Sequence, residues 1–366
     1  RQRQMCIRDR IKLDLSEGDL GLVLLGLGVG VLVALSLAGG IIGRFGSRAV
    51  TIIGAIAMSV FLPVLALAPN AIVLWLGLFL FGAATSTMDV AMNDQAVAVE
   101  QRARKPLMSS FHGAWSVGSL SGAILGAGIA GLSFGSLPHF IFGSILFIVL
   151  LMLFARYLLP TEGKKEKGQS IFRLPPRVVW PLGAIAFCAA IGEGAMADWS
   201  GVYLSRTFET TVAFAALGYA AFSLTMTIGR FTGDWLAVRF SPARVVRFGG
   251  LLAFLGVMAA IATTEPLIVL VGYAAVGFGV ANVVPLSFSA VGKLPDLPAG
   301  VGIAGVATIG YAGFLAGPPV IGLIAEATSL RFALLTVAVL VGSLIFLAQT
   351  INAANPQTQP AKMPSD

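Results

Sequence analysis

The sequence predicts an all-α polytopic membrane protein built from two helical bundles. The chain has 366 residues, of which 57% are hydrophobic and only 11% are charged, and its mean hydropathy is +0.90. Soluble domains carry about 25% charged residues, so this composition does not suffice to cover a soluble surface. The 44 glycines suit the close packing of membrane helices, where small residues let two backbones approach.

Membrane-spanning helices are expected wherever about 20 mostly apolar residues follow one another. Eleven such stretches are present, and short polar segments separate most of them. They cover residues 20–42, 49–68, 71–94, 107–132, 137–158, 178–203, 212–237, 243–263, 266–291, 299–325 and 330–351.

The longest polar interruption divides these stretches into two groups. Residues 160–177 are rich in Lys and contain Gly and Pro, so they are expected to form a cytoplasmic linker. The linker separates an N-terminal bundle, 11–159, from a C-terminal six-helix bundle, 178–351. Residues 352–366 are polar and Pro-rich and are expected to be a disordered cytoplasmic tail. Residues 1–10, RQRQMCIRDR, resemble translated adapter sequence and are treated as a non-native leader.

The distribution of Lys and Arg predicts the orientation in the membrane. If the loops alternate between the two sides, 17 of the 24 basic residues fall on one side and 3 on the other, with four in the leader. Cytoplasmic loops collect basic residues, so the C-terminus is expected in the cytoplasm of a bacterial cell, with the chain in its inner membrane. One further helix before residue 11 would make twelve, six on each side of the linker. We therefore expect the first transmembrane helix to be missing from this sequence.

Composition also excludes several classes of function. The net charge of +7 does not indicate a nucleic-acid partner, because the basic residues lie in short loops between apolar spans. Two cysteines, Cys6 and Cys188, are too few for a four-cysteine metal site. No phosphate-binding Walker loop is present. The sequence predicts neither an enzyme nor a cofactor, and its expected partners are a small-molecule solute and the lipid bilayer, with the chain a monomer.

Polar stripes interrupt two apolar helices of the first half. Asp89 and Asn93 lie one turn apart in the span that begins near residue 71, and they share a face. An acid inside a span is costly and is usually kept for a function, although a structural carboxylate is the alternative. In the next span, His112, Trp115 and Ser116 also share one face. An aromatic ring beside a hydroxyl suits a sugar, but a histidine that only packs is equally compatible with this pattern.

The second half carries its own polar residues inside apolar segments. Glu193 lies between two glycines in the span 178–203, which makes it the second candidate for a carboxylate in a solute pathway. Asp198 lies nearer the end of this span, next to Trp199, and is expected at the membrane interface. Asn282 precedes Pro285, and a proline that loosens a helix favours a position lining a cavity.

Two loops resemble each other and a known family signature. Gly39–Val50 and Ile228–Val246 both place glycines and arginines before the next span. They are similar to a loop of the Major Facilitator Superfamily, in which a glycine and an acid precede basic residues. The second copy keeps the acid as Asp234, whereas the first copy has Gly43. The resemblance implies the fold of that superfamily with 11 of 12 helices present, and it makes the following residues candidates for gating: Arg44, Arg48, Arg230, Asp234 and Arg239.

Within that superfamily the chain resembles the fucose permease branch, over about residues 20–350. The stretches that carry this resemblance are Met88–Asn93, Phe111–Gly118, Gly229–Pro242 and Asn282–Phe288. The branch implies proton-coupled uptake of a small polar solute such as a sugar, powered by the proton gradient without a cofactor. The resemblance assigns proton coupling to Asp89, with Glu193 second. Solute binding is expected at Asn93, His112, Trp115, Ser116 and Asn282.

Three hypotheses about function remain open at this point. The first is a proton symporter that works by alternating access. The second is a proton-driven exporter of drugs or metabolites, although a Gly-Pro feature that exporters often show in the fifth helix lies here in the eleventh, at Gly317 and Pro318. The third is a membrane sensor that binds a solute without transporting it.

Overall fold

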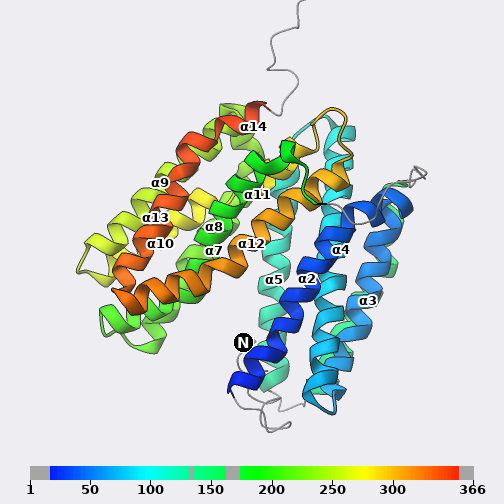
Figure 1. The fold of residues 1–366 in the computed structure, drawn as a ribbon, viewed down its shortest axis with the longest axis horizontal. Coiled ribbons are helices and arrows are strands. Elements are labelled where there is room, and N and C mark those ends of the chain that lie inside the picture. The colour runs from blue at the N-terminus through cyan, green and yellow to red at the C-terminus, as the bar shows by residue number, and fades with distance from the viewer. Residues whose placement is uncertain (1–16, 132–135, 162–173, 354–366) are drawn as a thin grey trace, which may run out of the picture. The chain divides into compact units, whose positions relative to one another are not determined.

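In the computed structural model, which describes residues 17–131, 136–161 and 174–353, every regular element is a helix. Figure 1 shows these helices as long, closely packed rods. Their bounds are α2 Glu17–Phe45, α3 Ser47–Leu67, α4 Ala71–Ala103, α5 Met108–Gly131, α6 Ser136–Phe154, η1 Ala155–Tyr157, η2 Arg177–Val179, α7 Trp180–Thr207, α8 Val212–Phe240, α9 Pro242–Ala262, α10 Pro266–Val280, α11 Val283–Val291, α12 Ala299–Ala327, α13 Leu330–Leu347 and α14 Gln349–Ala353.

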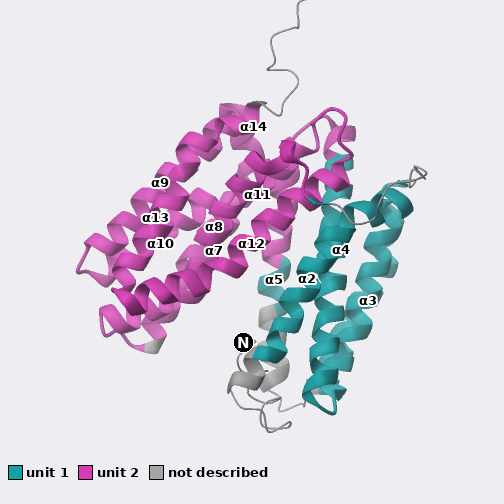
Figure 2. Cartoon of the chain, in the orientation of Figure 1, with its two compact units in different colours: residues 1–99, 118–174 teal, residues 100–117, 175–366 magenta. Residues whose placement is uncertain are grey.

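The chain divides into two compact units, shown in different colours in Figure 2. Unit 1 comprises residues 1–99 and 118–174, and unit 2 comprises residues 100–117 and 175–366. Two helices change unit along their length, because α4 passes from unit 1 into unit 2 at residue 100 and α5 passes back at residue 118. The segment 100–117, named here the hairpin tip, therefore belongs to the second unit although its helices continue into the first.

Close backbone contacts between α2 and α4 hold unit 1 together. A Cβ atom added to Gly30 would collide with the carbonyl oxygen of Phe79, and one added to Gly82 would collide with that of Leu27. Ser86 adds a hydrogen bond across the same contact, its Oγ lying 3.3 Å from the carbonyl oxygen of Val31. Glycine therefore serves here as the small residue that lets two membrane helices approach.

The helix α7 is central to unit 2, and it packs along α12, α8 and α13. Its middle third is almost entirely buried, including Ala189, Ile191 and Met196. Beside it, α9 and α10 meet through two reciprocal pairs of glycines, Gly249 with Gly279 and Gly256 with Gly272, at which an added Cβ would strike the partner's carbonyl oxygen. The pairs lie two turns apart on each helix, so this seam is specified by spacing as well as by residue type.

The structure confirms the predicted all-helical class and most of the predicted spans. Among the described residues, nine helical segments are long and apolar enough to cross a membrane. The helices α5 and α8, which hold most of the polar residues discussed below, are outside that set but extend over 24 and 29 residues. The expected span 266–291 is divided at Ala281 and Asn282 into α10 and α11, which agrees with a helix loosened near Pro285.

One expected loop is shorter than the sequence indicates. The predicted spans 71–94 and 107–132 leave residues 95–106 as the connection, yet α4 continues to Ala103. Glu100 is consequently in the last turn of a helix and only 5% exposed. The leader 1–10, most of the linker and the tail beyond Ala353 lie outside the described residues, and the predicted domain boundaries stay predictions.

The two similar loops share an unusual backbone conformation. Gly46, the N-cap of α3, has φ 78° and ψ 148°, and Ser241, the N-cap of α9, has φ 78° and ψ 146°. At Gly46 a Cβ would also collide with the carbonyl oxygen of Thr161. The matching angles extend the sequence repeat to the backbone. The second copy holds a serine in a region that is almost exclusive to glycine.

We predict that Ser241→Gly stabilises the protein by about 1 kcal/mol, because it removes this backbone strain. The Ser241 side chain makes no capping hydrogen bond that the substitution would remove. The measurement is the melting temperature of the purified full chain in detergent.

Ser329→Gly is the matched control, since Ser329 is also an N-cap but has an extended φ of −163° and accepts a hydrogen bond from the Phe332 amide. The free energy of unfolding of that variant should fall by a few tenths of a kcal/mol. A decrease in melting temperature for Ser241→Gly would contradict the strain argument.

Candidate functional site

The N-terminus of α5, within the hairpin tip, is capped by two carboxylates from other helices. The first four backbone N–H groups of a helix have no acceptor inside that helix. Here the first intrahelical bond runs from the Phe111 amide to the Leu107 carbonyl, 3.1 Å. The amides of residues 107, 108, 109 and 110 all find acceptors elsewhere.

Asp234 of α8 accepts from two of these four amides. The Ser109 N–H donates to Oδ1 at 3.0 Å, and the Ser110 N–H donates to Oδ2 at 2.8 Å. The Ser110 hydroxyl donates to the same Oδ2 at 2.5 Å. A carboxylate at a helix N-terminus also interacts favourably with the helix dipole. Asp234 therefore fastens α5 to α8 by charge and by geometry.

Glu100 of α4 accepts from the other two amides. Its Oε1 lies 2.9 Å from the Leu107 nitrogen and 3.3 Å from the Met108 nitrogen. Its Oε2 accepts from the Ser289 hydroxyl of α11 at 2.5 Å. Met108 and Ser109 are fully buried, so water does not replace these bonds. The hairpin tip is thus fixed to α8 and α11 by two acidic side chains, an arrangement named here the α5 cap.

A buried arginine lies deeper along the same helices. Arg230 of α8 is 8% exposed, and its Nη1 donates to Ser116 Oγ of α5 at 2.8 Å. Its Nη2 lies 3.6 Å from Glu193 Oε2 of α7. The Ser116 hydroxyl in turn lies 3.2 Å from the carbonyl oxygen of His112. The structure therefore brings Ser116, Glu193 and Arg230 together, three candidates from three different helices.

The other candidates on α5 flank this arginine cluster. His112 is half-buried, its ring lies 5.9 Å from that of Phe288, and its Nε2 is buried without a hydrogen-bond partner. Trp115 is 52% exposed. Its position on the helix face next to Ser116 agrees with the predicted stripe, and its exposure leaves the ring accessible.

The stripe on α4 lies in unit 1, and two of its side chains contact each other. Asn93 is only 4% exposed, and its amide nitrogen lies 2.9 Å from the Asp89 carbonyl oxygen and 3.3 Å from Asp89 Oδ1. Asp89 itself is half-buried. The predicted i to i+4 relation between the two side chains is therefore present as direct contact.

Asn282 is more buried than the predicted position lining a cavity would make it. It is 3% exposed, its amide donates to the Gly229 carbonyl at 2.9 Å, and its Oδ1 has no hydrogen-bond partner. A Cβ on Gly233 would strike that Oδ1 and would lie 2.7 Å from Ser109 Oγ. Asn282 thus joins the break between α10 and α11 to α8, and its role in solute binding stays a prediction.

The predicted gating residues lie in both units, Arg44 and Arg48 in unit 1 and the other three in unit 2. Arg44 is exposed with its guanidinium 5.5 Å from the Phe45 ring, and Arg239 lies similarly 5.8 Å from the ring of Phe240. Arg48 contributes its backbone N–H, which donates to Thr161 Oγ1 at 3.0 Å.

Arg230 and Asp234 lie one turn apart on α8 but contact different groups. Arg230 contacts Ser116 and Glu193, whereas Asp234 contacts the start of α5. The reason is that each side chain reaches a neighbouring helix that sequence spacing does not reveal.

The predictions made from the sequence left out several polar residues. Gln95 is 4% exposed and bonds to Ser47 Oγ and to both backbone groups of Leu159, so it ties α3 to the segment that follows η1 within unit 1. On α8, Tyr219, Ser223 and Thr227 continue the spacing of Arg230 and Asp234 toward the N-terminus of the helix. Their intervals of three and four residues keep them on one face, a signal that was available from the sequence.

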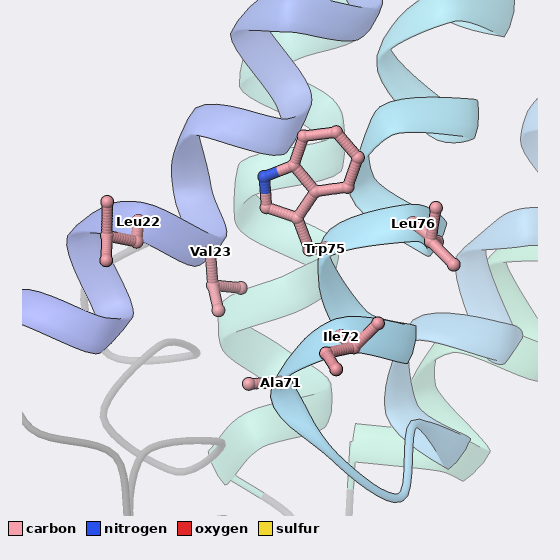
Figure 3. Close-up of a pocket in the computed structure, with 6 residues that line it drawn as sticks. All are labelled: Leu22, Val23, Ala71, Ile72, Trp75 and Leu76. Carbon is pink, nitrogen blue, oxygen red and sulfur yellow. The ribbon is translucent and has the colours of Figure 1, made fainter.

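Unit 1 contains an apolar groove between α2 and α4, away from the polar stripe of α4. It has a volume of about 460 Å³, and Figure 3 shows the Trp75 ring between α2 and α4. Trp75 is 14 residues before Asp89, or roughly 20 Å along the helix. The groove is lined by Leu22, Val23, Ala71, Ile72, Trp75 and Leu76. Its lining offers a polar solute little besides the indole N–H.

In the part of the chain that the structure describes, no group of three or more His, Cys, Asp and Glu side chains lies close enough to hold a metal ion. Cys188 is buried and lies 3.4 Å from the hydroxyl of Ser343, which agrees with a packing role.

Comparison with known proteins identifies the family. A sequence profile described as Major Facilitator Superfamily matches residues 10–301. The chain belongs to this superfamily. It is therefore a multi-pass membrane protein and a secondary transporter of a small solute, not an enzyme.

Curated relatives agree with the family assignment. The chain is 36% identical over 331 residues to an uncharacterised transporter of the superfamily from Yersinia pestis, covering 90% of this chain and 86% of that protein. It is 34% identical over 349 residues to the membrane protein MosC of Rhizobium meliloti, covering 94% and 84%. It is 35% identical over 341 residues to an uncharacterised transporter of Sinorhizobium fredii, covering 92% and 89%.

Solved structures support the fold. The Escherichia coli fucose:proton symporter FucP matches with a TM-score of 0.69 and 16% identity over 92% of this chain and 91% of that chain. The human organic anion transporter MFSD10 matches with a TM-score of 0.73 and 17% identity over 90% and 84%. At this identity the likeness concerns the fold alone, and the predicted superfamily fold is confirmed.

We predict that Asp234→Ala lowers the melting temperature, because the buried amides of Ser109 and Ser110 lose their acceptor. Leaving such groups unsatisfied costs about 1–3 kcal/mol. Glu326→Ala is the control, since Glu326 is exposed near the end of α12 and has helical backbone angles. A melting temperature for Asp234→Ala equal to that of the control would contradict the α5 cap.

Proposed function

We propose that this secondary transporter takes up a small polar solute together with a proton across a bacterial inner membrane. The observation that carries the proposal is a carboxylate inside a membrane span of each unit, Asp89 in α4 and Glu193 in α7. Both are half-buried, so each is shielded from bulk water yet accessible. Ionisable groups at such depth are expensive and mark ion or proton pathways.

Asp89 is the first coupling candidate in this proposal. Its hydrogen-bonded neighbour Asn93 holds the carboxylate on the polar face of α4. Protonation removes the charge of Asp89. A neutral carboxylic acid moves from water into an apolar environment at a much lower cost in free energy than an ionised carboxylate. Glu193 is the second candidate, and its contact with Arg230 gives its charge a partner that a protonated Glu193 would release.

Alternating access requires contacts that form in one state and break in another. The α5 cap is suited to this role, because the hairpin tip is bonded to α8 and α11 while its two helices continue into unit 1. Movement of α4 and α5 would detach the amides from Asp234 and Ser289 from Glu100. We propose that the α5 cap is the gating element. In this proposal Arg44, Arg48 and Arg239 also take part in gating, on the cytoplasmic side of the membrane.

Uptake of a sugar-like solute is supported by the residues on α5. Trp115 is exposed beside Ser116, and a ring next to a hydroxyl accommodates both the apolar face and the hydroxyls of a carbohydrate. Asn93 and Asn282 are both more than nine-tenths buried. In this proposal they become accessible to the solute when the transporter changes conformation. The proton gradient supplies the energy in this proposal, and a single chain forms the pathway.

We predict that Asp89→Asn abolishes proton-coupled uptake. Cells that produce the full chain, suspended in weak buffer, are given L-fucose, D-galactose or D-glucose while the external pH is recorded. A symporter removes protons from the medium with the solute, so the pH rises when a substrate is added. The Asp89→Asn variant should produce no such rise, because an amide does not load a proton.

Asp296→Asn, at an exposed position, serves as the matched control and should behave as wild type. Unchanged alkalinisation in Asp89→Asn would remove Asp89 from the coupling mechanism. Expulsion of preloaded solute in place of accumulation would indicate an exporter, and binding without flux would indicate a sensor.

A further inference from the structure

We infer that Arg230 is the binding group for a carboxylate on the solute, and that the solute anion displaces Glu193 from it. The inference rests on the proposed function and names its substrate class, a small acid such as a sugar acid. Guanidinium groups bind carboxylates through two parallel N–H donors, which makes arginine well suited to recognising such anions.

The contacts of Arg230 leave most of its donors unused. A guanidinium has five N–H donors. The structure gives one hydrogen bond, from Nη1 to Ser116, and one ion-pair contact of 3.6 Å from Nη2 to Glu193. Charge-assisted hydrogen bonds between such groups measure about 2.7–2.9 Å, so the Glu193 contact is loose. Nε is buried without any hydrogen-bond partner.

A second unsatisfied group lies on the neighbouring turn of the partner helix. His112 is one turn before Ser116 on α5, and its Nε2 is buried without a partner. Ser116 connects the two, since it accepts from Arg230 and contacts the His112 carbonyl. Polar groups buried away from water are normally hydrogen-bonded. Two such exceptions, on two residues that both contact Ser116, indicate a site that is completed by a ligand.

The glycines on either side of Glu193 pack against apolar residues of other helices. A Cβ added to Gly194 would lie 3.4 Å from Phe314 of α12, and one added to Gly192 would lie 2.9 Å from Val341 of α13 and 3.8 Å from Val280 of α10. These three side chains bring no charge to this turn of α7.

The charged and titratable groups near Glu193 come from α5, from α8 and from α7 itself, where Asp198 lies five residues further along and near Tyr219 of α8. From α8 the charged partner of Glu193 is Arg230, and Tyr219 lies on the same face of that helix. From α5 the titratable group at the cluster is His112. Arg230 is therefore the cation that an approaching anion would share with Glu193.

Protonation and anion binding are coupled by this arrangement. When Glu193 takes a proton, Arg230 becomes a buried cation without a counter-charge, which is strongly unfavourable. A carboxylate from the solute restores the balance. Binding of the anion favours protonated Glu193 by the same amount, because coupling between two sites is reciprocal. One proton and one monoanion therefore move together, and the charge within the site is unchanged.

The side chain of Glu193 is 30% exposed whereas that of Arg230 is 10% exposed. The carboxylate is thus the more accessible member of the pair and the one able to leave. We place the remainder of a bound acid against Trp115, which is exposed and directly precedes Ser116 on α5.

The test measures binding to the purified full chain by calorimetry, with matched acid and neutral compounds. The pairs are D-glucuronate with D-glucose, D-galacturonate with D-galactose, and D-lactate with glycerol. At least one acid should bind at least about tenfold more tightly than its neutral counterpart, a difference that calorimetry resolves. A pH dye in weak buffer should record the uptake of one proton for each acid bound.

Variants assign these effects to residues. Arg230→Gln should weaken acid binding by about tenfold or more, whereas Arg244→Gln, at an exposed arginine of α9, should not. Glu193→Gln should retain acid binding and lose the proton uptake, whereas Glu326→Gln, also exposed, should keep both. If Arg230→Gln does not fold, the result for Glu193→Gln decides.

Binding of the neutral member of a pair as tightly as the acid would overturn the inference, as would the absence of binding by all three acids. Proton uptake that persists in Glu193→Gln would also overturn it. These failures leave the proposed function intact if a neutral sugar is still taken up with a proton in an Asp89-dependent manner. Conversely, Arg230-dependent acid binding without flux would refute the proposed function and support the site.

Discussion

Four backbone N–H groups at the start of α5 have no acceptor in their own helix, and their satisfaction by Glu100 and Asp234 is the constraint on which unit 2 depends. Met108 and Ser109 are fully buried, so the alternative to these bonds is a set of unpaired amides. That cost fixes the hairpin tip to α8 and α11. Because the bonds connect a carboxylate with backbone amides, they are directional and break together when the helix moves away.

The same requirement explains the other buried polar residues. Gln95 uses its amide to pair both backbone groups of Leu159, after η1 in unit 1, and Asn282 closes the break between α10 and α11 onto α8. Each pairs a backbone group that would otherwise be buried without a partner. Arg230 differs, because it has more N–H donors than hydrogen-bond acceptors around it. The contrast separates residues that hold the fold from a residue that has capacity for a ligand.

Hydropathy and spacing predicted the helical class, nearly every helix and the repeat around Gly46 and Ser241, because lipid makes the length and composition of a span highly informative. Spacing also placed Asp89 with Asn93, and His112 with Ser116, since those pairs lie within one helix. It failed for Glu100 and for the partners of Arg230 and Asp234. Those contacts join helices far apart in sequence, and no periodicity within one helix carries that information.

Hydrogen exchange at single amides of α5 tests the central claim most directly. The amides of residues 107–110 should be protected in the wild-type full chain. In Asp234→Asn those of Ser109 and Ser110 should exchange about tenfold faster while Leu107 changes less, and Glu100→Gln should give the reverse pattern. Equal exchange at all four amides in wild type and both variants would contradict the account, because the carboxylates would then not be what holds the helix start in place.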